Sequence, residues 1–200
     1  MKEINDLHPD GRPYTKEEFK QKIKSDKEFN KKYGNQGINQ LQNIIDTLKT
    51  NPDDRRMIVS AWAPHDIKDM ALPPCHWSYQ FYTNQHPNEE KRRLHIKMNI
   101  RSWDIFLGGP FNIASYALLL MMMAQEVDMI PGDLIISAGD VHIYENHLEY
   151  ILKQLERNSK GGVPKMVLNP EKGFWNFIPE DFTLENYDPH SNWKNVPVAV

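Results

Sequence analysis

Two stretches of the chain carry hydrophobic residues at helical spacing. Apolar residues recur along one helical face before Pro52, which predicts a helix that packs on a core. These residues are Ile38, Leu41, Ile44, Ile45 and Leu48. Residues 111–127 are apolar almost throughout and predict a longer, buried helix. Two further helices are expected, one over residues 16–33 with Thr15 as its N-cap, and one over residues 142–157.

Strand-like runs lie among these helices. Runs rich in β-branched, aromatic and alternating apolar residues predict five strands. They lie at residues 57–62, 76–82, 94–101, 134–137 and 166–168. The glycines and proline at 108–110 predict a turn before the long helix. Because helices and strands do not follow a strict β-α order, the sequence predicts one mixed α+β domain over residues 1–200.

Composition narrows the class of protein. A chain of 200 residues, 40% hydrophobic and 26% charged, is typical of a globular domain with a real core. The most apolar run, residues 116–124, is too short to span a bilayer, so no membrane partner is expected. A net charge of −3 gives no overall attraction to nucleic acid. One cysteine allows no internal disulfide and the first residues lack a secretory signal, so a cytoplasmic location is predicted.

That single cysteine, Cys75, is followed by His76. A thiolate attacks far better than a thiol, and neighbouring cations stabilise it, so Cys75 is a candidate nucleophile. The ordinary alternative is that Cys75 is a small buried hydrophobe. A metal site is not expected. His142 and His147 would lie on different faces of the predicted helix, no cysteine cluster accompanies them, and His147 is expected to be structural.

Five short motifs occur in a distinctive order. They are DRR at 54–56, PCH at 74–76, RSWD at 101–104, GGPFNIASY at 108–116 and GDVHIY at 139–144. With DPH at 188–190 and the final VAV at 198–200, they make the chain resemble thymidylate synthase from about residue 38 to residue 200. The FNIASY block is the most specific. The resemblance implies a mainly antiparallel sheet packed by helices, with one sheet face forming a two-fold dimer.

The resemblance also implies a reaction. Members of this family methylate deoxyuridylate (dUMP) reductively to dTMP, with 5,10-methylenetetrahydrofolate as the cosubstrate. Cys75 matches the thiolate that adds to C6 of uracil and so makes C5 nucleophilic. Asp104 matches the residue that hydrogen-bonds the folate ring and helps to activate it. Ala199 and Val200 match the end residues that close over the folate.

Further residues match the dUMP-binding positions. Arg101 and Ser102 match phosphate ligands from the same subunit, and planar guanidinium groups bind phosphate bidentately. Arg55 and Arg56 match a pair that reaches the phosphate of the other subunit in a homodimer. For paired arginines, a surface salt bridge is the ordinary alternative. Gln80 matches a supporting donor.

Other residues match the family positions that bind the uracil base and the sugar. Asn112 matches the residue that reads the uracil edge, since an amide can donate and accept at once. Members that act on cytosine nucleotides carry aspartate there, which favours dUMP for this chain. His142 and Tyr144 match groups that hold the sugar hydroxyl, and Asp140 matches a residue that supports them.

The chain also departs from the family pattern. The resemblance implies a member without the usual N-terminal arginine loop, glutamate helix and paired tryptophans. Tyr33 fits either a remnant of the family's tyrosine loop or an insertion found in some bacterial members, and is left unassigned. Two alternatives to a self-sufficient enzyme stay open. One is a separate polypeptide that supplies the missing part, and the other is a truncated, non-catalytic dimer subunit that binds nucleotide.

Some departures lie inside the matched region. Trp103 is large and Gly109 is small for their positions, and Trp77 is bulky beside the nucleophile, which suggests compensated packing or a reshaped pocket. Ile100 replaces a glutamine that synthases usually carry. This leaves room for deoxyuridylate hydroxymethylation, in which water instead of hydride captures the methylene group, as the second interpretation.

Overall fold

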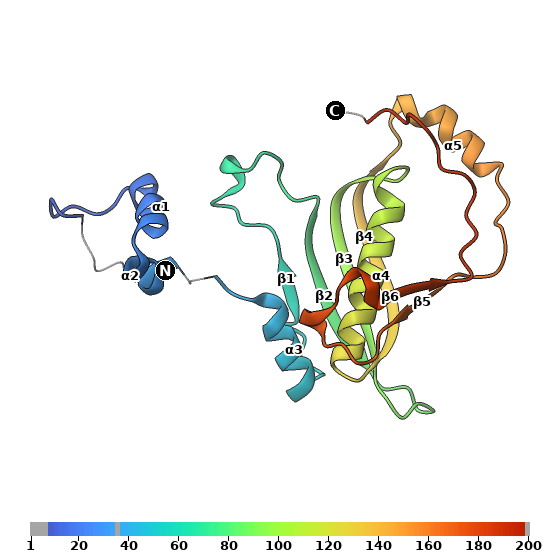
Figure 1. Cartoon of the computed structure of the whole chain (residues 1–200), viewed down its shortest axis with the longest axis horizontal. Helices are drawn as coiled ribbons and strands as arrows, with labels where there is room; N and C mark the ends of the chain where they lie inside the picture. The colour runs from blue at the N-terminus through green and yellow to red at the C-terminus, as the bar shows by residue number, and fades with distance from the viewer. Residues whose placement is uncertain (1–7, 35–36, 199–200) are drawn as a thin grey trace. The chain divides into compact units, whose positions relative to one another are not determined.

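The computed structural model describes residues 8–34 and 37–198 (Figure 1). The chain divides into two compact units, Met1–Asn39 and Gln40–Val200. The single domain expected over residues 1–200 stays a prediction.

Over residues 8–34, the first unit contains two short helices and one π-helical turn. Helix α1 (Lys16–Ser25) begins at Thr15, whose hydroxyl accepts from the Glu18 N–H while Glu18 accepts from the Thr15 N–H. This capping box confirms the predicted N-cap. The turn α2 (Lys27–Phe29) and the π-helical turn η1 (Asn30–Gly34) follow.

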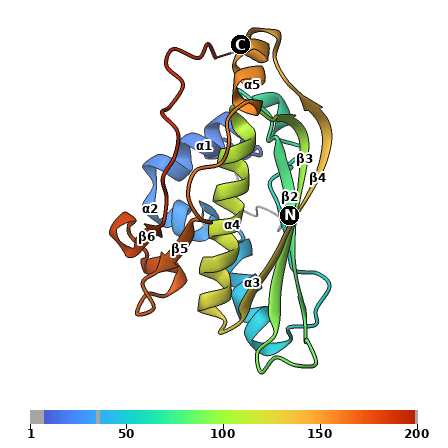
Figure 2. The same ribbon diagram turned by 90° about the vertical axis from the view of Figure 1, so that its right-hand side faces the viewer.

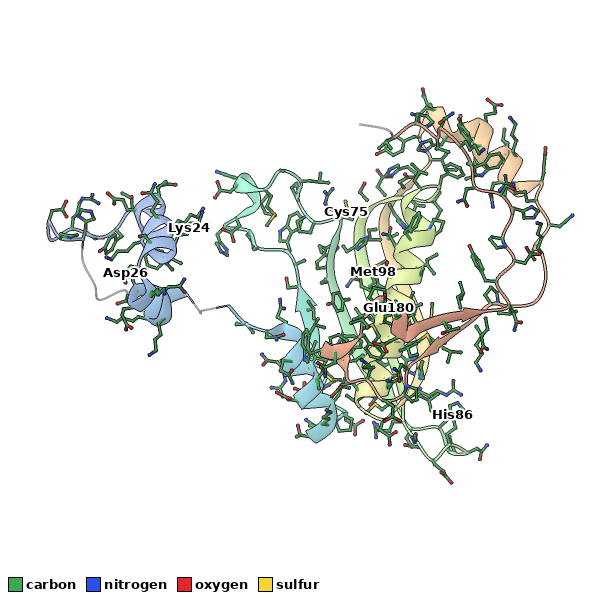
Figure 3. The ribbon with its side chains drawn as sticks, viewed as in Figure 1. Lys24, Asp26, Cys75, His86, Met98 and Glu180 are labelled. Carbon is green, nitrogen blue, oxygen red and sulfur yellow. The ribbon has the colours of Figure 1, made fainter. Side chains whose placement is uncertain are left out.

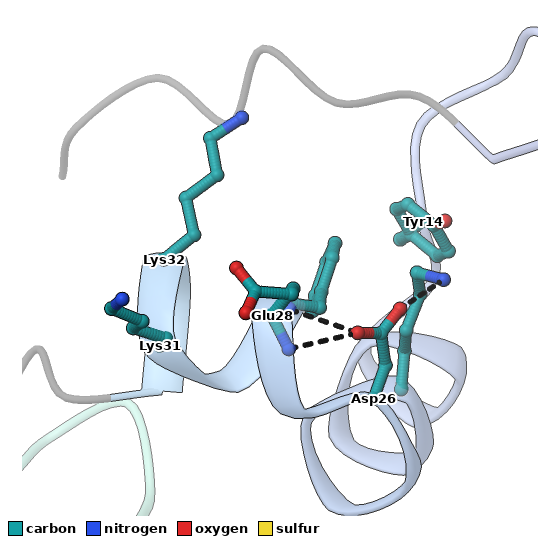
Figure 4. A pocket seen from close by; sticks show the side chains of 7 residues that line it. Tyr14, Asp26, Glu28, Lys31 and Lys32 are labelled. Carbon is teal, nitrogen blue, oxygen red and sulfur yellow. Dashed lines mark hydrogen bonds and ion pairs between the residues drawn. The ribbon is translucent and has the colours of Figure 1, made fainter.

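The single helix predicted over residues 16–33 is therefore wrong, and Asp26 is the reason. Its backbone is extended, with φ −117° and ψ 108°, and its carboxylate accepts from the N–H groups of Glu28 and Phe29 at 3.1 and 3.0 Å (Figure 4). Because Asp26 has the extended backbone of an N-cap, the helix before it ends there and a new one begins. The Phe29 N–H, followed by the Lys22 ammonium, also lowers the pKa of Asp26.

A small aromatic core holds this unit together. Phe29 packs against Tyr14 and Phe19 with ring centroids 5.4 and 5.3 Å apart, and against Tyr33 at 4.7 Å. Tyr33, left unassigned from the sequence, is buried in this cluster. Its position gives it a packing role within the first unit.

A four-stranded sheet forms the centre of the second unit. Its strands are β1 (Ile58–Ser60), β2 (His76–Asn84), β3 (Arg93–Asp104) and β4 (Ile130–His142), in the order β1-β2-β3-β4. The first two pairings are antiparallel, and β3 pairs with β4 in parallel. The parallel pair needs a long crossover connection, which helix α4 (Gly108–Glu126) supplies. This arrangement confirms the predicted α+β fold with a mainly antiparallel sheet.

The core lies between one sheet face and the helices. Figure 2 shows α4 lying along that face, and α3 (Gln40–Thr50) contributes to the same core. The cluster joins residues from both helices, from the sheet, from the segment just before β1 and from a C-terminal 3-10 turn: Ile44, Ile45, Leu48, Met57, Phe81, Leu94, Ile96, Leu120, Met123, Ala124 and Phe174. Ile38 was expected to join this core, but its side chain is 75% exposed because α3 begins only at Gln40.

Two other boundaries differ from the sequence prediction. Residues 108–110 form the first turn of α4 and not a separate turn, because a proline in the first helical turn loses no intrahelical hydrogen bond. Strand β4 runs over 13 residues and ends at His142, so the helix predicted over 142–157 is wrong at its start. A 3-10 turn, η3 (Glu145–His147), follows the strand and leads into α5 (Leu148–Leu155).

The C-terminal part forms a second small sheet. Strand β5 (Lys165–Leu168), which the sequence predicted, pairs antiparallel with β6 (Phe182–Glu185), which it did not. Three more 3-10 turns occur, η2 (Ile67–Asp69), η4 (Phe174–Asn176) and η5 (Pro179–Asp181). Among the helices that the structure describes, none is long and apolar enough to cross a membrane.

Candidate active site

Cys75 lies directly before β2, at the end of the sheet opposite the hairpin that carries His86 (Figure 3). It is half-buried, so it is not the small buried hydrophobe of the ordinary interpretation. The Arg101 N–H donates to the Cys75 carbonyl at 2.9 Å. The Arg101 guanidinium donates to the carbonyls of Pro74 and Pro73 at 3.0 and 2.9 Å. Three hydrogen bonds from β3 thus fix the loop that carries the thiol, and a permanent cation lies beside that loop.

Ser102 and Asp104 follow on the same strand. The parallel register places Ser102 opposite Asp140 and Asp104 opposite His142. Side chains two residues apart on a strand point to the same face, so these polar groups gather at one end of the β3–β4 pair. Asp104 Oδ1 accepts from the N–H groups of Phe106 and Leu107 at 3.0 and 3.3 Å. One carboxylate oxygen therefore shapes the turn into α4, and the other accepts no hydrogen bond from the residues that the structure describes.

His142 and Tyr144, both matched to groups that hold the sugar hydroxyl, lie next to each other. Their rings meet edge to face with centroids 5.0 Å apart. His142 Nδ1 is 3.6 Å from Asp140 Oδ1, which is too long for a hydrogen bond. This buried nitrogen has no hydrogen-bond partner among the described residues. Asp140 can therefore orient the His142 ring only through its charge, or through a hydrogen bond that forms when the two side chains move slightly closer.

The arginine pair lies on the segment before β1. Arg56 donates to both oxygens of Asp54 at 3.1 and 2.7 Å, and its side chain is 89% exposed. These hydrogen bonds lower the pKa of Asp54 to about 2. Gln80 Nε2 donates to the Arg55 carbonyl at 2.9 Å, so Gln80 supports the arginine segment from β2. The structure thus brings Gln80 together with Arg55.

Asn112 lies in the first part of α4, and its side chain has a partner that the sequence did not indicate. Trp103 Nε1 donates to Asn112 Oδ1 at 3.1 Å. A Cβ atom added at Gly108 would lie 3.3 Å from the same oxygen. A Cβ at Gly109 would meet Asp104 and Ile105 at an ordinary 3.7 Å. The sequence interpretation of Trp103 and Gly109 as a compensating pair finds no support in these contacts, since Trp103 pairs with Asn112.

The last two residues of the candidate site, Ala199 and Val200, lie outside the described residues. The segment just before them is fixed by His147, whose side chain is fully buried. His147 Nε2 donates to the Pro197 carbonyl at 2.6 Å. His147, expected to be structural, thus anchors the C-terminal segment. Within residues 8–34 and 37–198, no group of three His, Cys, Asp or Glu side chains could hold a metal ion.

Tyr116, the last residue of the FNIASY motif, belongs to an aromatic group that the sequence did not indicate. The Tyr116 ring lies 5.4 Å from the rings of both His76 and Tyr79, between the strand that follows Cys75 and helix α4. Burial, with a smaller contribution from Tyr79, raises the pKa of Tyr116 to about 12. Tyr116 therefore stays a neutral phenol at all moderate pH values. Only contacts between distant segments reveal this group.

This raised pKa makes a prediction about stability at alkaline pH. Below pH 10, the ordinary pKa of tyrosine, Tyr116 is neutral in both the folded and the unfolded chain. Between pH 10 and about 12 the unfolded chain ionises first, so the contribution of Tyr116 to stability is lost over that window. Y116F should lose less stability than wild type over this window. Thermal unfolding midpoints as a function of pH measure the difference, and parallel curves for the two proteins would contradict it.

Fold and site together define a class of protein. It is an α+β protein in which a half-exposed thiol lies on a loop fixed by an arginine of the neighbouring strand, at the end of the sheet where a long helix begins. The sequence model of the thymidylate synthase family matches residues 13–200, and so begins well before the resembling region. The chain therefore belongs to the thymidylate synthase family. This is a folate-dependent, methyltransferase-type enzyme family whose members normally bind dUMP and form dimers.

Proposed function

We propose that this chain converts dUMP to dTMP by reductive methylation, with 5,10-methylenetetrahydrofolate as the one-carbon donor. The observation that carries the proposal is the attachment of the Cys75 loop to Arg101 through three hydrogen bonds. Such a loop presents a nucleophile in a fixed position, with the Arg101 guanidinium bound to the loop backbone.

The chemistry proceeds in balanced steps. The Cys75 thiolate adds to C6 of uracil, and the displaced electron pair makes C5 a nucleophile. C5 attacks the methylene carbon while the bond from that carbon to one folate nitrogen breaks. Loss of the C5 proton then drives cleavage of the remaining bond between the methylene carbon and the folate, so tetrahydrofolate leaves and an exocyclic methylene stays on C5 while the sulfur stays on C6. Hydride from tetrahydrofolate adds to this methylene carbon and completes the methyl group, the electron pair that moves into the ring expels the Cys75 sulfur from C6, and dihydrofolate is left.

Arg101 has enough N–H donors to bind the substrate phosphate as well as the loop. The guanidinium has five N–H donors, and two nitrogens each donate once to the loop carbonyls. The remaining donors, with the Ser102 hydroxyl, can bind the dUMP phosphate. One side chain would then fix both the nucleophile loop and the substrate, which aligns C6 with the thiol.

Other groups would hold the base, the sugar and the folate. We assign the uracil edge to Asn112, the sugar hydroxyl to His142 and Tyr144, and the folate to Asp104. A pocket of about 760 Å³ supports the folate assignment. Residues directly after Asp104 line it, together with the start of α4, helix α5 and the C-terminal segment. Ala199 and Val200 are proposed to close over the bound folate.

The outer face of the sheet supports a homodimer. Val59 and Leu134 pack on the core, so their neighbours Ile58 and Ile135 point to the opposite face, where they are 49% and 41% exposed. Val141 shares that face with Ile135 and is 51% exposed. Apolar side chains on an uncovered sheet face fit a two-fold interface. In such a dimer, Arg55 and Arg56 would bind the phosphate of the partner subunit.

The identity of the product tests the proposal. The full-length protein is incubated with dUMP and 5,10-methylenetetrahydrofolate, and the nucleotide is analysed by mass spectrometry. A methylated product together with dihydrofolate is expected. A hydroxymethylated product would favour the second candidate, deoxyuridylate hydroxymethylation, which is kept because Ile100 stands where synthases usually carry glutamine. Nucleotide binding without conversion would favour a non-catalytic dimer subunit or an enzyme completed by a separate polypeptide.

A further inference from the structure

We propose that Trp103 is a positioning residue that fixes the orientation of the Asn112 amide and thereby sets the preference for uracil over cytosine nucleotides. The inference rests on the proposed function, because it takes Asn112 as the reader of the base. It assigns a role to a tryptophan that occupies a position where a small residue is usual.

The contact joins two elements of the site. Trp103 lies on β3 between Ser102 and Asp104, and Asn112 lies near the start of α4. Both side chains are half-buried, and Trp103 Nε1 donates to Asn112 Oδ1 at 3.1 Å. No other side-chain hydrogen bond of Asn112 occurs among the described residues, so this one sets how the amide is turned.

The indole group admits only one of the two amide orientations. The two ends of an asparagine amide have nearly the same shape, but the oxygen accepts and the nitrogen donates, whereas the indole N–H only donates. A half-turn of the Asn112 amide would bring two donors together and lose the hydrogen bond. The orientation of Asn112 is therefore determined before any nucleotide binds.

A fixed amide distinguishes the two pyrimidines. Uracil presents an N3–H donor beside the O4 acceptor, and cytosine presents an N3 acceptor beside an amino donor. The amide oxygen has two lone pairs, so Oδ1 can accept from Trp103 and from uracil N3–H while Nδ2 donates to O4. Cytosine would need the flipped amide, which Trp103 opposes. The indole N–H thus acts on the base through Asn112 and does not contact it.

The test compares nucleotide affinities, so it needs no catalytic turnover. Kd values for dUMP and dCMP are measured with full-length wild type and with W103F, which keeps a large aromatic ring but has no N–H. Wild type should bind dUMP more tightly. In W103F the dUMP-over-dCMP preference should fall about tenfold, the change expected from one hydrogen bond of ordinary strength. Most of the change should appear as tighter dCMP binding.

Trp175 supplies a matched control. Its Nε1 also donates to a side-chain amide oxygen, that of Gln42, at 2.7 Å. W175F therefore makes the same chemical change away from the proposed site and should leave the preference unchanged. If W103F folds poorly in thermal unfolding, W103Y replaces it. A phenol hydroxyl donates or accepts, so it tolerates both amide orientations and should also reduce the preference.

The outcomes separate the two proposals. A W103F or W103Y protein that keeps the wild-type preference would overturn the role of Trp103 and leave the proposed function intact. A wild-type protein that binds neither nucleotide, or prefers dCMP, would count against the proposed function itself. A preference that falls equally in W175F would show that the effect is not specific to Asn112, and would also overturn the inference.

Discussion

C75A should abolish the conversion of dUMP, with kcat falling by about four to six powers of ten, the scale expected when a covalent nucleophile is removed. Cys75 is the only cysteine in the chain, so no second thiol can replace it. Without addition at C6, uracil C5 is not nucleophilic enough to attack the folate. The measurement is the rate of product formation at saturating dUMP and folate.

The same variant should keep its affinity for dUMP to within a few-fold. The hydrogen bonds that fix the loop run from Arg101 to the backbone carbonyls of residues 73–75, and none involves the Cys75 side chain. C75S is the matched control for size, and its hydroxyl, a far weaker nucleophile, should leave at most a trace of turnover. Undiminished product from C75A would remove Cys75 from the mechanism.

F81A should reduce the free energy of unfolding by about 3–5 kcal/mol. Phe81 is fully buried at the centre of β2 and belongs to the core that joins the sheet to α3 and α4. Its removal leaves a cavity that the surrounding side chains cannot fill completely. Since a domain is typically stable by only about 5–15 kcal/mol, the variant should lie close to unfolding. Urea denaturation measures the change.

F111A is the control for this prediction. It removes the same atoms from a side chain that is 75% exposed, so its cost should stay within about 0.5 kcal/mol. A loss below about 1 kcal/mol in F81A, or equal losses in the two variants, would contradict the assignment of the core.

Local patterns predicted the two core-facing helices and the positions of most strands, but not the full length of β4. The helical spacing of Ile44, Ile45 and Leu48 predicted α3, and all three side chains are buried. Strand β4 was predicted over residues 134–137 only, and the structure extends it in both directions, across Gly132 and Gly139. At both glycines β4 comes very close to β3: a Cβ would lie 2.6 Å from the ring of a histidine on β3 and 2.9 Å from a β3 carbonyl, respectively. Tertiary packing determines this strand, and a single sequence does not display it.

The candidate site was also only partly predictable from the sequence. Motifs in the sequence, through their resemblance to one family, supplied the residue types and their order. They could not predict that Arg101 binds the carbonyls of Pro73 and Pro74, 28 and 27 residues away in the sequence, because that contact depends on how β2 and β3 pair. The bond from Trp103 to Asn112 was equally hidden, since it requires the strand and the next helix to be placed in space.

Release of the C5 hydrogen tests the central claim most directly. The full-length protein is given dUMP labelled with tritium at C5, with and without 5,10-methylenetetrahydrofolate, and tritium in water is counted. Substitution at C5 must expel this hydrogen whether hydride or water ends the reaction. We predict folate-dependent release by wild type and none by C75A. No release under conditions where dUMP is bound, or equal release by C75A, would contradict cysteine-dependent substitution at C5.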